Sequence, residues 1–350
     1  MLSQIEFSLR RWITIWAVVL SFPFVFFCQA ERVFSATKDE PTHKQVFTIK
    51  PTVEGRKVTL ENFCVGPRGN LWMACCSTRE DGSAPVGLIM IYEPTGLLFN
   101  SFTLDFIPQA INFSPNERLY IAGSGKVARV SLGGTVEVEV KAPHLGSQSE
   151  QSDEQTRQRL IGITGIAATE NGVFVACPLQ ADDRYGVWRM SPDLSVEGLV
   201  IKEASGCCGQ LDIQSDGEHL IVAENIKFEI GIYDRNGKRL SGFGQGSSDS
   251  LEGFGSTCNP MNIRCRSDGE ILTAESSLGH IKRYSRDGKF IALVGTAKVA
   301  SSCKRVPIGF DSERNWYYMM NQDMSHVAVL MHKDEAPDEN LDEEKPVDAR

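Results

Sequence analysis

The chain has 350 residues, 41% of them hydrophobic and 23% charged, which is the balance of an ordinary globular protein with room for a large core. Its formal net charge is −9. Lys and Arg never form a run longer than two residues, so the sequence lacks the basic clustering that a nucleic-acid partner requires.

The N-terminus has the pattern of a signal peptide over residues 1–30. An Arg-Arg pair precedes an apolar run of 16 residues, Trp12 to Phe27, and Cys28 and Ala30 place small residues at the −3 and −1 positions of a cleavage site. We expect cleavage after Ala30, followed by a linker over 31–42. An uncleaved anchor over 12–28 is the alternative, because the run is near the lower limit for a spanning helix.

From residue 43 to residue 332 the sequence repeats itself about every 40–50 residues. Short apolar runs that end in Ala plus one variable residue recur as LWMAC (71–75), LYIAG (119–123), VFVAC (173–177), LIVAE (220–224) and ILTAE (271–275). A more divergent sixth copy contains VPIGFDSERNWYYMM and HVAVLMH. Turns with Gly, Asp or Asn separate these runs from other strand-like segments, giving about four strands per repeat.

Six repeats of four short antiparallel strands predict an all-β fold, a six-bladed β-propeller. A lone strand-like stretch, HKQVFTIKP (43–51), precedes the first repeat, and the last repeat ends early, near His332. We predict that the lone strand completes the last blade, because this closes the ring and removes its open edges. Two stacked sheets with a similar strand count are the alternative architecture.

Two of the repeats resemble the NHL repeat. They are FGSTCNPMNIRCRSDGEILTAESSLGHIKRYSRDGKFIALVG (254–295) and CCGQLDIQSDGEHLIVAENIKFEIGIYDRNGKRLSGFG (207–244); the other four copies match loosely. The resemblance implies a six-bladed propeller. It does not imply one activity, because NHL propellers include binding scaffolds as well as a few lyases and hydrolases.

Two segments lie outside the repeats. Residues 144–159, HLGSQSEQSDEQTRQR, are polar and predict an exposed loop within the propeller. Residues 333–350 carry eight acids and three bases without an apolar pattern, and we expect a disordered tail there.

Nine cysteines follow Cys28, an odd number, so at least one is free, metal-bound or paired with another chain. The repeat places seven of them on one face, at the mouth of the central channel. Four precede innermost strands: Cys207, Cys208, Cys258 and Cys303. Three end second strands: Cys75, Cys76 and Cys177. Cys64 and Cys265 fall within innermost strands, where we expect small buried hydrophobic residues.

Equivalent positions of the repeats predict two rings of side chains around the channel mouth. The position after the repeated Ala is occupied by Cys75, Gly123, Cys177, Glu224, Glu275 and Met320. A channel-lining ring is predicted at Asn62, Ala110, Gly165, Asp212, Asn262 and Pro307. The candidate ligand or metal residues are therefore the seven cysteines of this face together with Glu224, Glu275, Asp212 and Asn262.

Three hypotheses account for the cysteines. They form disulfides between neighbouring blades, for example Cys258 with Cys303, or Cys75 or Cys76 with Cys177. Alternatively, thiolates bind zinc or copper together with Glu224, Glu275 or Asp212. Thiol redox chemistry is the third hypothesis, although no CxxC motif is present.

Other site chemistries have less sequence support. Glu224, Glu275, Asp212 and Asn262 offer oxygen atoms for calcium, as in lactonase-type propellers, but Asn and Asp also cap innermost strands. The six histidines occupy different blade positions, so we do not expect a histidine metal centre. No catalytic residue is identified.

These observations favour an exported, non-enzymatic propeller that binds a protein or a small molecule on the cysteine-bearing face. A metal-dependent hydrolase or lyase at the channel mouth is the alternative. We expect a monomer in the periplasm or outside the cell, with a membrane association only if the N-terminal segment stays uncleaved.

Overall fold

The computed structural model describes residues 39–79, 81–144, 161–179, 184–256, 258–300 and 303–337. The expected signal peptide, nearly all of the polar loop and most of the acidic tail lie outside these ranges. All described residues belong to one compact unit, residues 37–350. Within them, no helix combines the length and apolarity needed to cross a membrane.

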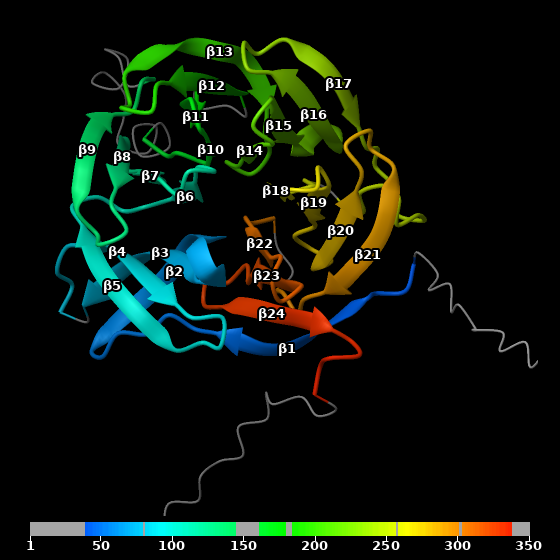
Figure 1. Ribbon diagram of the computed structural model, residues 1–350, viewed down its shortest axis with the longest axis horizontal. Coiled ribbons are helices and arrows are strands. Elements are labelled where there is room, and N and C mark those ends of the chain that lie inside the picture. The colour runs from blue at the N-terminus through cyan, green and yellow to red at the C-terminus, as the bar shows by residue number, and fades with distance from the viewer. Residues whose placement is uncertain are drawn as a thin grey trace, which may run out of the picture. The chain divides into compact units, whose positions relative to one another are not determined.

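The described chain forms six four-stranded sheets around a central axis, as Figure 1 shows. Neighbouring strands within each sheet pair antiparallel, as in the first blade. This confirms the predicted six-bladed β-propeller.

The first three blades contain these strands: blade 1, β2 (Arg56–Val65), β3 (Leu71–Arg79), β4 (Val86–Tyr92) and β5 (Leu98–Leu104); blade 2, β6 (Ala110–Phe113), β7 (Leu119–Gly123), β8 (Lys126–Val130) and β9 (Val136–Lys141); blade 3, β10 (Gly165–Thr169), β11 (Gly172–Pro178), β12 (Arg184–Met190) and β13 (Val196–Ser205).

The other three blades contain these strands: blade 4, β14 (Ile213–Ser215), β15 (His219–Glu224), β16 (Glu229–Asp234) and β17 (Arg239–Phe243); blade 5, β18 (Asn262–Cys265), β19 (Ile271–Ala274), β20 (His280–Tyr284) and β21 (Phe290–Thr296); blade 6, β22 (Ile308–Asp311), β23 (Trp316–Met320), β24 (Val327–His332) and β1 (His43–Ile49). Two short 3-10 helices, η1 (Pro67–Gly69) and η3 (Asn225–Lys227), follow β2 and β15.

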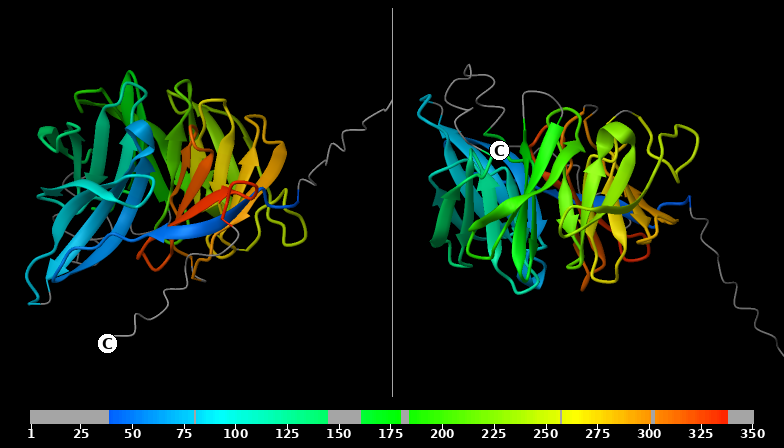
Figure 2. Two further views of the ribbon diagram at one scale, coloured as in Figure 1. Left: turned by 60° about the horizontal axis from the view of Figure 1, so that its bottom comes forward. Right: turned by 90° about the horizontal axis from the view of Figure 1, so that it is seen from above.

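The strands of each blade run between two faces, which Figure 2 shows from the side. One face carries the turns between the first and second strands. The opposite face, called the loop face below, carries the loops that leave each second strand and the loops that lead into each innermost strand.

The ring closes through β1, as predicted. This N-terminal strand pairs antiparallel with β24 from His43 opposite His332 to Ile49 opposite Val327, so the blue and red strands of Figure 1 lie side by side. The two histidine rings meet edge to face with their centroids 5.2 Å apart, a pairing that the sequence did not indicate. Burial lowers the pKa of His43 to about 4, although its Nε2 atom bonds to the carbonyl of Asn315 at 3.0 Å.

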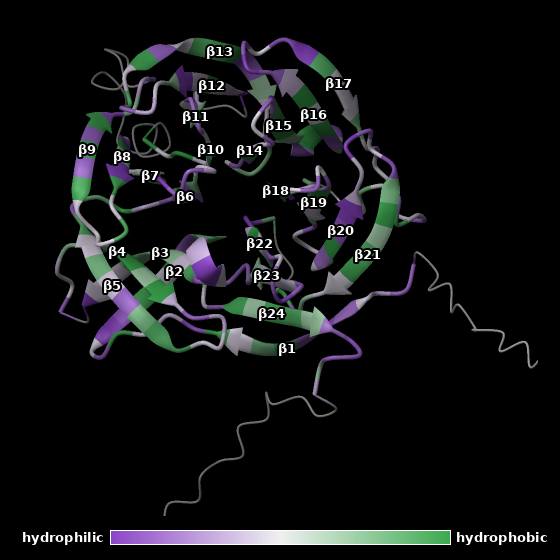
Figure 3. Cartoon of the chain, in the orientation of Figure 1, coloured by the Kyte–Doolittle hydropathy of each residue, from purple (hydrophilic) through white to green (hydrophobic). Residues whose placement is uncertain are grey.

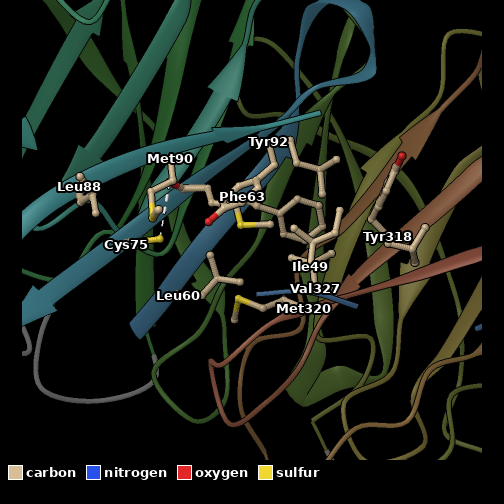
Figure 4. Close-up of a cluster of buried hydrophobic side chains, with 13 residues drawn as sticks. Ile49, Leu60, Phe63, Cys75, Leu88, Met90, Tyr92, Tyr318, Met320 and Val327 are labelled. Carbon is tan, nitrogen blue, oxygen red and sulfur yellow. Dashed lines mark hydrogen bonds between the residues drawn. The ribbon is translucent and has the colours of Figure 1, made fainter. Parts of the chain in front are cut away.

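The second strand of each blade is covered on both faces, which explains why its sequence is continuously apolar. Leu71, Met73 and Cys75 of β3 face a cluster shared with blade 6, drawn in Figure 4, where the Cys75 thiol donates to the Met73 carbonyl at 3.7 Å. Trp72 and Ala74, which point the other way, join a cluster shared with blade 2. Strand residues alternate between sheet faces, so each face is buried against a different blade.

The same arrangement recurs around the ring, because six apolar clusters each combine residues from two adjacent blades. The outermost strand of blade 2 is different. Along β9 most side chains are exposed or partly exposed, and Figure 3 shows hydrophilic residues interleaved along this rim strand, whereas β24 is mainly hydrophobic.

One glycine turn also joins neighbouring blades. Gly237, in the Asn-Gly turn between β16 and β17, has φ +83°. A Cβ atom at this position would lie 1.8 Å from the carbonyl oxygen of Val200 in β13 of blade 3. Glycine is therefore required here both by the left-handed backbone and by the close approach of the two blades.

The ring closure predicts the effect of truncating Ile49, which is 2% exposed in the cluster between blades 6 and 1. Ile49→Ala is expected to lower the free energy of unfolding by about 2–5 kcal/mol, because it leaves a cavity at the closing interface. Phe99→Ala, on exposed β5, should change it by no more than about 0.5 kcal/mol. Urea unfolding of both variants tests this, and equal losses would contradict the buried role of β1.

Candidate functional site

Four of the predicted cysteines meet on the loop face. Cys207 and Cys208 lie in the loop that leads into β14, Cys258 in the loop into β18, and Cys303 in the loop into β22. The sulfur atoms of Cys207 and Cys258 are 2.8 Å apart, and that of Cys208 is 3.5 Å from each of them. The Cys303 thiol interacts with those of Cys208 and Cys258. We call these four residues the thiol cluster.

A tight turn allows the two adjacent cysteines to face the same place. The amide of Gln210 donates to the Cys207 carbonyl at 3.0 Å, and the two central residues, Cys208 and Gly209, have φ +56° and +71°. Two consecutive positive φ values are typical of a type I′ turn. In an extended strand successive side chains point to opposite sides, so adjacent thiols would separate there.

A buried asparagine holds this turn at both ends. Asn225, the first residue of η3, is fully buried; its Oδ1 accepts from the Cys207 amide at 2.7 Å and its Nδ2 donates to the Gln210 carbonyl at 3.4 Å. The end of β15 therefore positions the Cys207–Gln210 turn.

Asn259 has the same role beside Cys258. It is fully buried, its Nδ2 donates to the Gly255 carbonyl at 2.7 Å, and its Oδ1 accepts from the Ser276 amide at 2.9 Å. Cys258, like Cys208, has a positive φ, here +66°. Such a conformation is uncommon for residues other than glycine and costs of the order of 1–3 kcal/mol, so both loops hold their cysteines at an energetic cost.

The cluster combines one exposed thiol with three that are more enclosed. Cys208 is exposed, Cys207 and Cys303 are partly buried, and Cys258 is buried. Burial is the main cause that raises the pKa of Cys208 to about 11, and burial together with the neighbouring thiols raises the pKa of Cys258 further. Both thiols are therefore protonated at neutral pH when no cation is bound.

The other three cysteines of the predicted face lie elsewhere. Cys75 is buried between blades 6 and 1, Cys177 between blades 2 and 3, and Cys76 is partly buried on β3. None of the nine cysteines in the described ranges is in a disulfide, so neither predicted bridge, Cys258–Cys303 nor Cys75 or Cys76 to Cys177, is present. Cys64 is buried as expected, and Cys265 is partly buried against the cluster between blades 4 and 5.

Glu224 and Glu275 do not join the thiols. Glu224 pairs with Lys227 at 2.6 Å, and Glu275 forms a buried ion pair with Lys282, whose Nζ also donates to the Gly253 carbonyl at 2.7 Å. Among the described residues, the cysteine, histidine, aspartate and glutamate side chains spaced closely enough to hold a metal ion are Cys207, Cys208 and Cys258. The mixed set of thiolates and carboxylates predicted from the sequence is therefore not assembled.

The residues of the first predicted ring, at the position after the repeated Ala, are all buried, and none of them is among the residues that line the channel. Side chains of a second strand alternate between the two faces of its blade, so this position faces a neighbouring blade. The second ring does line the channel: Asn62, Ala110, Gly165, Asp212, Asn262 and Pro307.

Polar bonds run around this channel from each blade to the next. We call this set the polar relay. Taken around the ring from blade 1, its members are Asn62 Nδ2 to the Gln109 carbonyl (3.0 Å), Ile163 N–H to Gln109 Oε1 (3.1 Å), Thr164 Oγ1 to the Leu211 carbonyl (2.7 Å), Ile263 N–H to Asp212 Oδ2 (2.9 Å), Val306 N–H to Asn262 Oδ1 (2.7 Å) and Arg305 Nη2 to Glu61 Oε2 (3.3 Å).

Asp212 and Asn262 belong to this relay, and Asn262 Nδ2 also donates to Asp212 Oδ2 at 3.0 Å. The Asp212 and Asn262 oxygen atoms that the sequence offered to calcium thus accept hydrogen bonds from neighbouring blades.

The position of Asp212 predicts a pH dependence of stability. Burial raises its pKa to about 6, despite the nearby charge of Arg264, so the folded state holds the proton more tightly than the unfolded state. The free energy of unfolding should therefore fall as pH rises from about 4 to about 6, by up to about 3 kcal/mol from this group. Asp212→Asn should remove that part of the slope in urea unfolding.

Burial also raises the pKa values of Glu61 and Glu275, and both remain in the variant. The difference between the two pH curves therefore isolates Asp212. Glu54→Gln, at an exposed acid with no ion pair among the described residues, is the control and should keep the wild-type slope. Identical slopes for Asp212→Asn and the wild type would show that Asp212 titrates normally in the folded chain.

Comparisons with known proteins find structural matches of low sequence identity but no sequence family. No protein-family model and no curated protein sequence matches the chain. Among solved structures, an inactive virginiamycin B lyase from Staphylococcus aureus with quinupristin is 14% identical, covers 83% of this chain and 99% of its own, and has a TM-score of 0.49. A gluconolactonase from Xanthomonas campestris is 12% identical, with 83% and 95% coverage and a TM-score of 0.49. At these values, neither activity follows for this chain.

Proposed function

We propose that the protein is an exported, non-enzymatic β-propeller that binds its ligand on the loop face, at the thiol cluster. The observation that carries this proposal is the convergence of four thiols from three separate loops, two of them at positive φ. Backbone strain persists where the surrounding structure imposes it, and it is concentrated at functional sites.

A hydrolase or lyase at the same place has less support. Such an enzyme needs a general acid or base within hydrogen-bonding reach of the reacting atoms. The two candidate carboxylates, Glu224 and Glu275, are buried in ion pairs with Lys227 and Lys282. We therefore place binding ahead of catalysis for this site.

Thiol alkylation tests the binding proposal, because Cys208 is exposed when the site holds no ligand. In protein isolated without chelators or reductants, Cys208 should react with a maleimide more slowly than the partly buried Cys76, since a ligand covers it. After denaturation with a chelator, both should react fully. Mass spectrometry of peptides reads out each position.

Two results would overturn this proposal. Rapid alkylation of Cys208 in the native protein would mean that no ligand occupies the cluster. A Cys208 that reacts only after reduction would identify a disulfide instead of a binding site.

Export is the second part of the proposal, and the N-terminal pattern supports it. The mature protein recovered from cells that make the full chain should begin at Glu31, because Cys28 and Ala30 form the expected cleavage site. Intact-mass measurement tests this. A mature chain that retains residues 12–28 would contradict cleavage and would favour the alternative, an uncleaved membrane anchor.

A further inference from the structure

We propose that the thiol cluster is a binding site for one soft metal ion, Zn²⁺, with the sulfur atoms of Cys207, Cys208, Cys258 and Cys303 as ligands. This inference rests on the proposed function, because it identifies the ligand of that same site. The metal would connect the loops that lead into blades 4, 5 and 6.

The distances between the sulfur atoms suit a shared ion. Zinc binds thiolates at about 2.3 Å, so a tetrahedral site places its sulfur atoms about 3.8 Å apart. The separations of Cys208 from Cys207 and Cys258 are both 3.5 Å, and only the 2.8 Å separation of Cys207 and Cys258 has to widen appreciably. Small side-chain rotations would open the triangle of Cys207, Cys208 and Cys258 to hold the ion. The Cys303 thiol, which interacts with those of Cys208 and Cys258 but lies outside this group of three, would have to move closer to supply the fourth ligand.

The backbone already aims the ligands. Cys208 in the type I′ turn brings its thiol beside that of Cys207, and Cys258 reaches them from another loop through its own positive φ. An ordinary extended backbone would satisfy neither requirement. Metal–sulfur bonds would add to the hydrogen bonds of Asn225 and Asn259 that hold these two left-handed cysteines in place.

The surroundings match those of a structural metal site. Fully buried Asn225 and Asn259 fix the two loops through backbone hydrogen bonds, as outer-shell residues do around metal ligands. Cys258 belongs to the apolar cluster between blades 5 and 6, with Met261 and Val306, so apolar side chains border one side of the site. Ordered ligands and an apolar shell that excludes water both favour tight metal binding.

The ligand chemistry selects the class of metal. Thiolates are soft donors that prefer zinc, copper(I) or iron–sulfur clusters, whereas calcium and magnesium prefer oxygen. A site closed by four thiolates is typical of structural zinc and leaves no open position for a reacting water. The chemistry thus agrees with a non-enzymatic role.

Metal analysis of the full chain tests the inference. Protein purified without chelators should contain about one zinc ion per chain by elemental mass spectrometry. Replacement by Co²⁺ should give the intense sulfur-to-cobalt charge-transfer absorption of a tetrathiolate site. A chelator should lower the melting temperature, because an ion bound only by the folded state stabilises it.

Single substitutions separate the ligands from the other cysteines. Cys208→Ser and Cys258→Ser should each lower zinc affinity at least tenfold, and Cys303→Ser should leave a cobalt spectrum with weaker sulfur absorption. Cys76→Ser is the matched control, a partly buried cysteine outside the cluster, and should keep full zinc content. Because Cys208 is exposed, its serine variant should stay folded without metal, and its melting temperature should respond less to the chelator than that of the wild type.

The outcomes distinguish this inference from the proposed function. If Cys208 is protected from alkylation but the protein contains no stoichiometric metal, the metal inference is overturned, while the proposal that the cluster binds another ligand still stands. Copper(I) in place of zinc would overturn the choice of ion. Equal zinc affinity of the wild type and of Cys208→Ser would also overturn the inference, because the ion would then lie elsewhere. Rapidly alkylated Cys208 would overturn both proposals.

Discussion

Burial of both faces of every sheet is the constraint on which this structure depends. A second strand such as β3 is apolar at successive positions, so neither face of its blade tolerates water, and each needs a neighbouring blade. Six such interfaces can all be satisfied only if the ring closes. The pairing of β1 with β24 closes it, and the cluster around Ile49 fills the last interface.

Closure brings the innermost strands together around the channel, where their polar groups must find partners. The polar relay supplies these partners between successive blades, including Asp212 with Ile263 and Asn262 with Val306. The loops that carry the relay also carry the thiols: Cys208 lies four residues before Asp212, and Cys303 lies two residues before Arg305. The bonds that align the blades therefore also limit where the thiols can lie.

Periodicity predicted the blades, the closing strand and the channel lining, because each depends on alternation along a strand and on repeat spacing. The same reasoning placed Cys75, Cys177, Glu224 and Glu275 at the channel mouth, whereas the structure buries all four and none of them lines the channel. A repeat alignment identifies equivalent positions but not the face of the blade toward which a second-strand side chain points. Lys282, which lies in the third strand of the same repeat, could have signalled that Glu275 was already paired.

The sequence by itself determined the six-bladed architecture and the presence of Cys207, Cys208, Cys258 and Cys303 in loops that lead into innermost strands. It left open which of the cysteines meet. The tertiary structure decided that, because the separation of two sulfur atoms depends on loop conformation: the left-handed backbone at Cys208 and Cys258, and the hydrogen bonds of buried Asn225 and Asn259. Such conformations follow from contacts between residues about 15–50 positions apart, which no local pattern records.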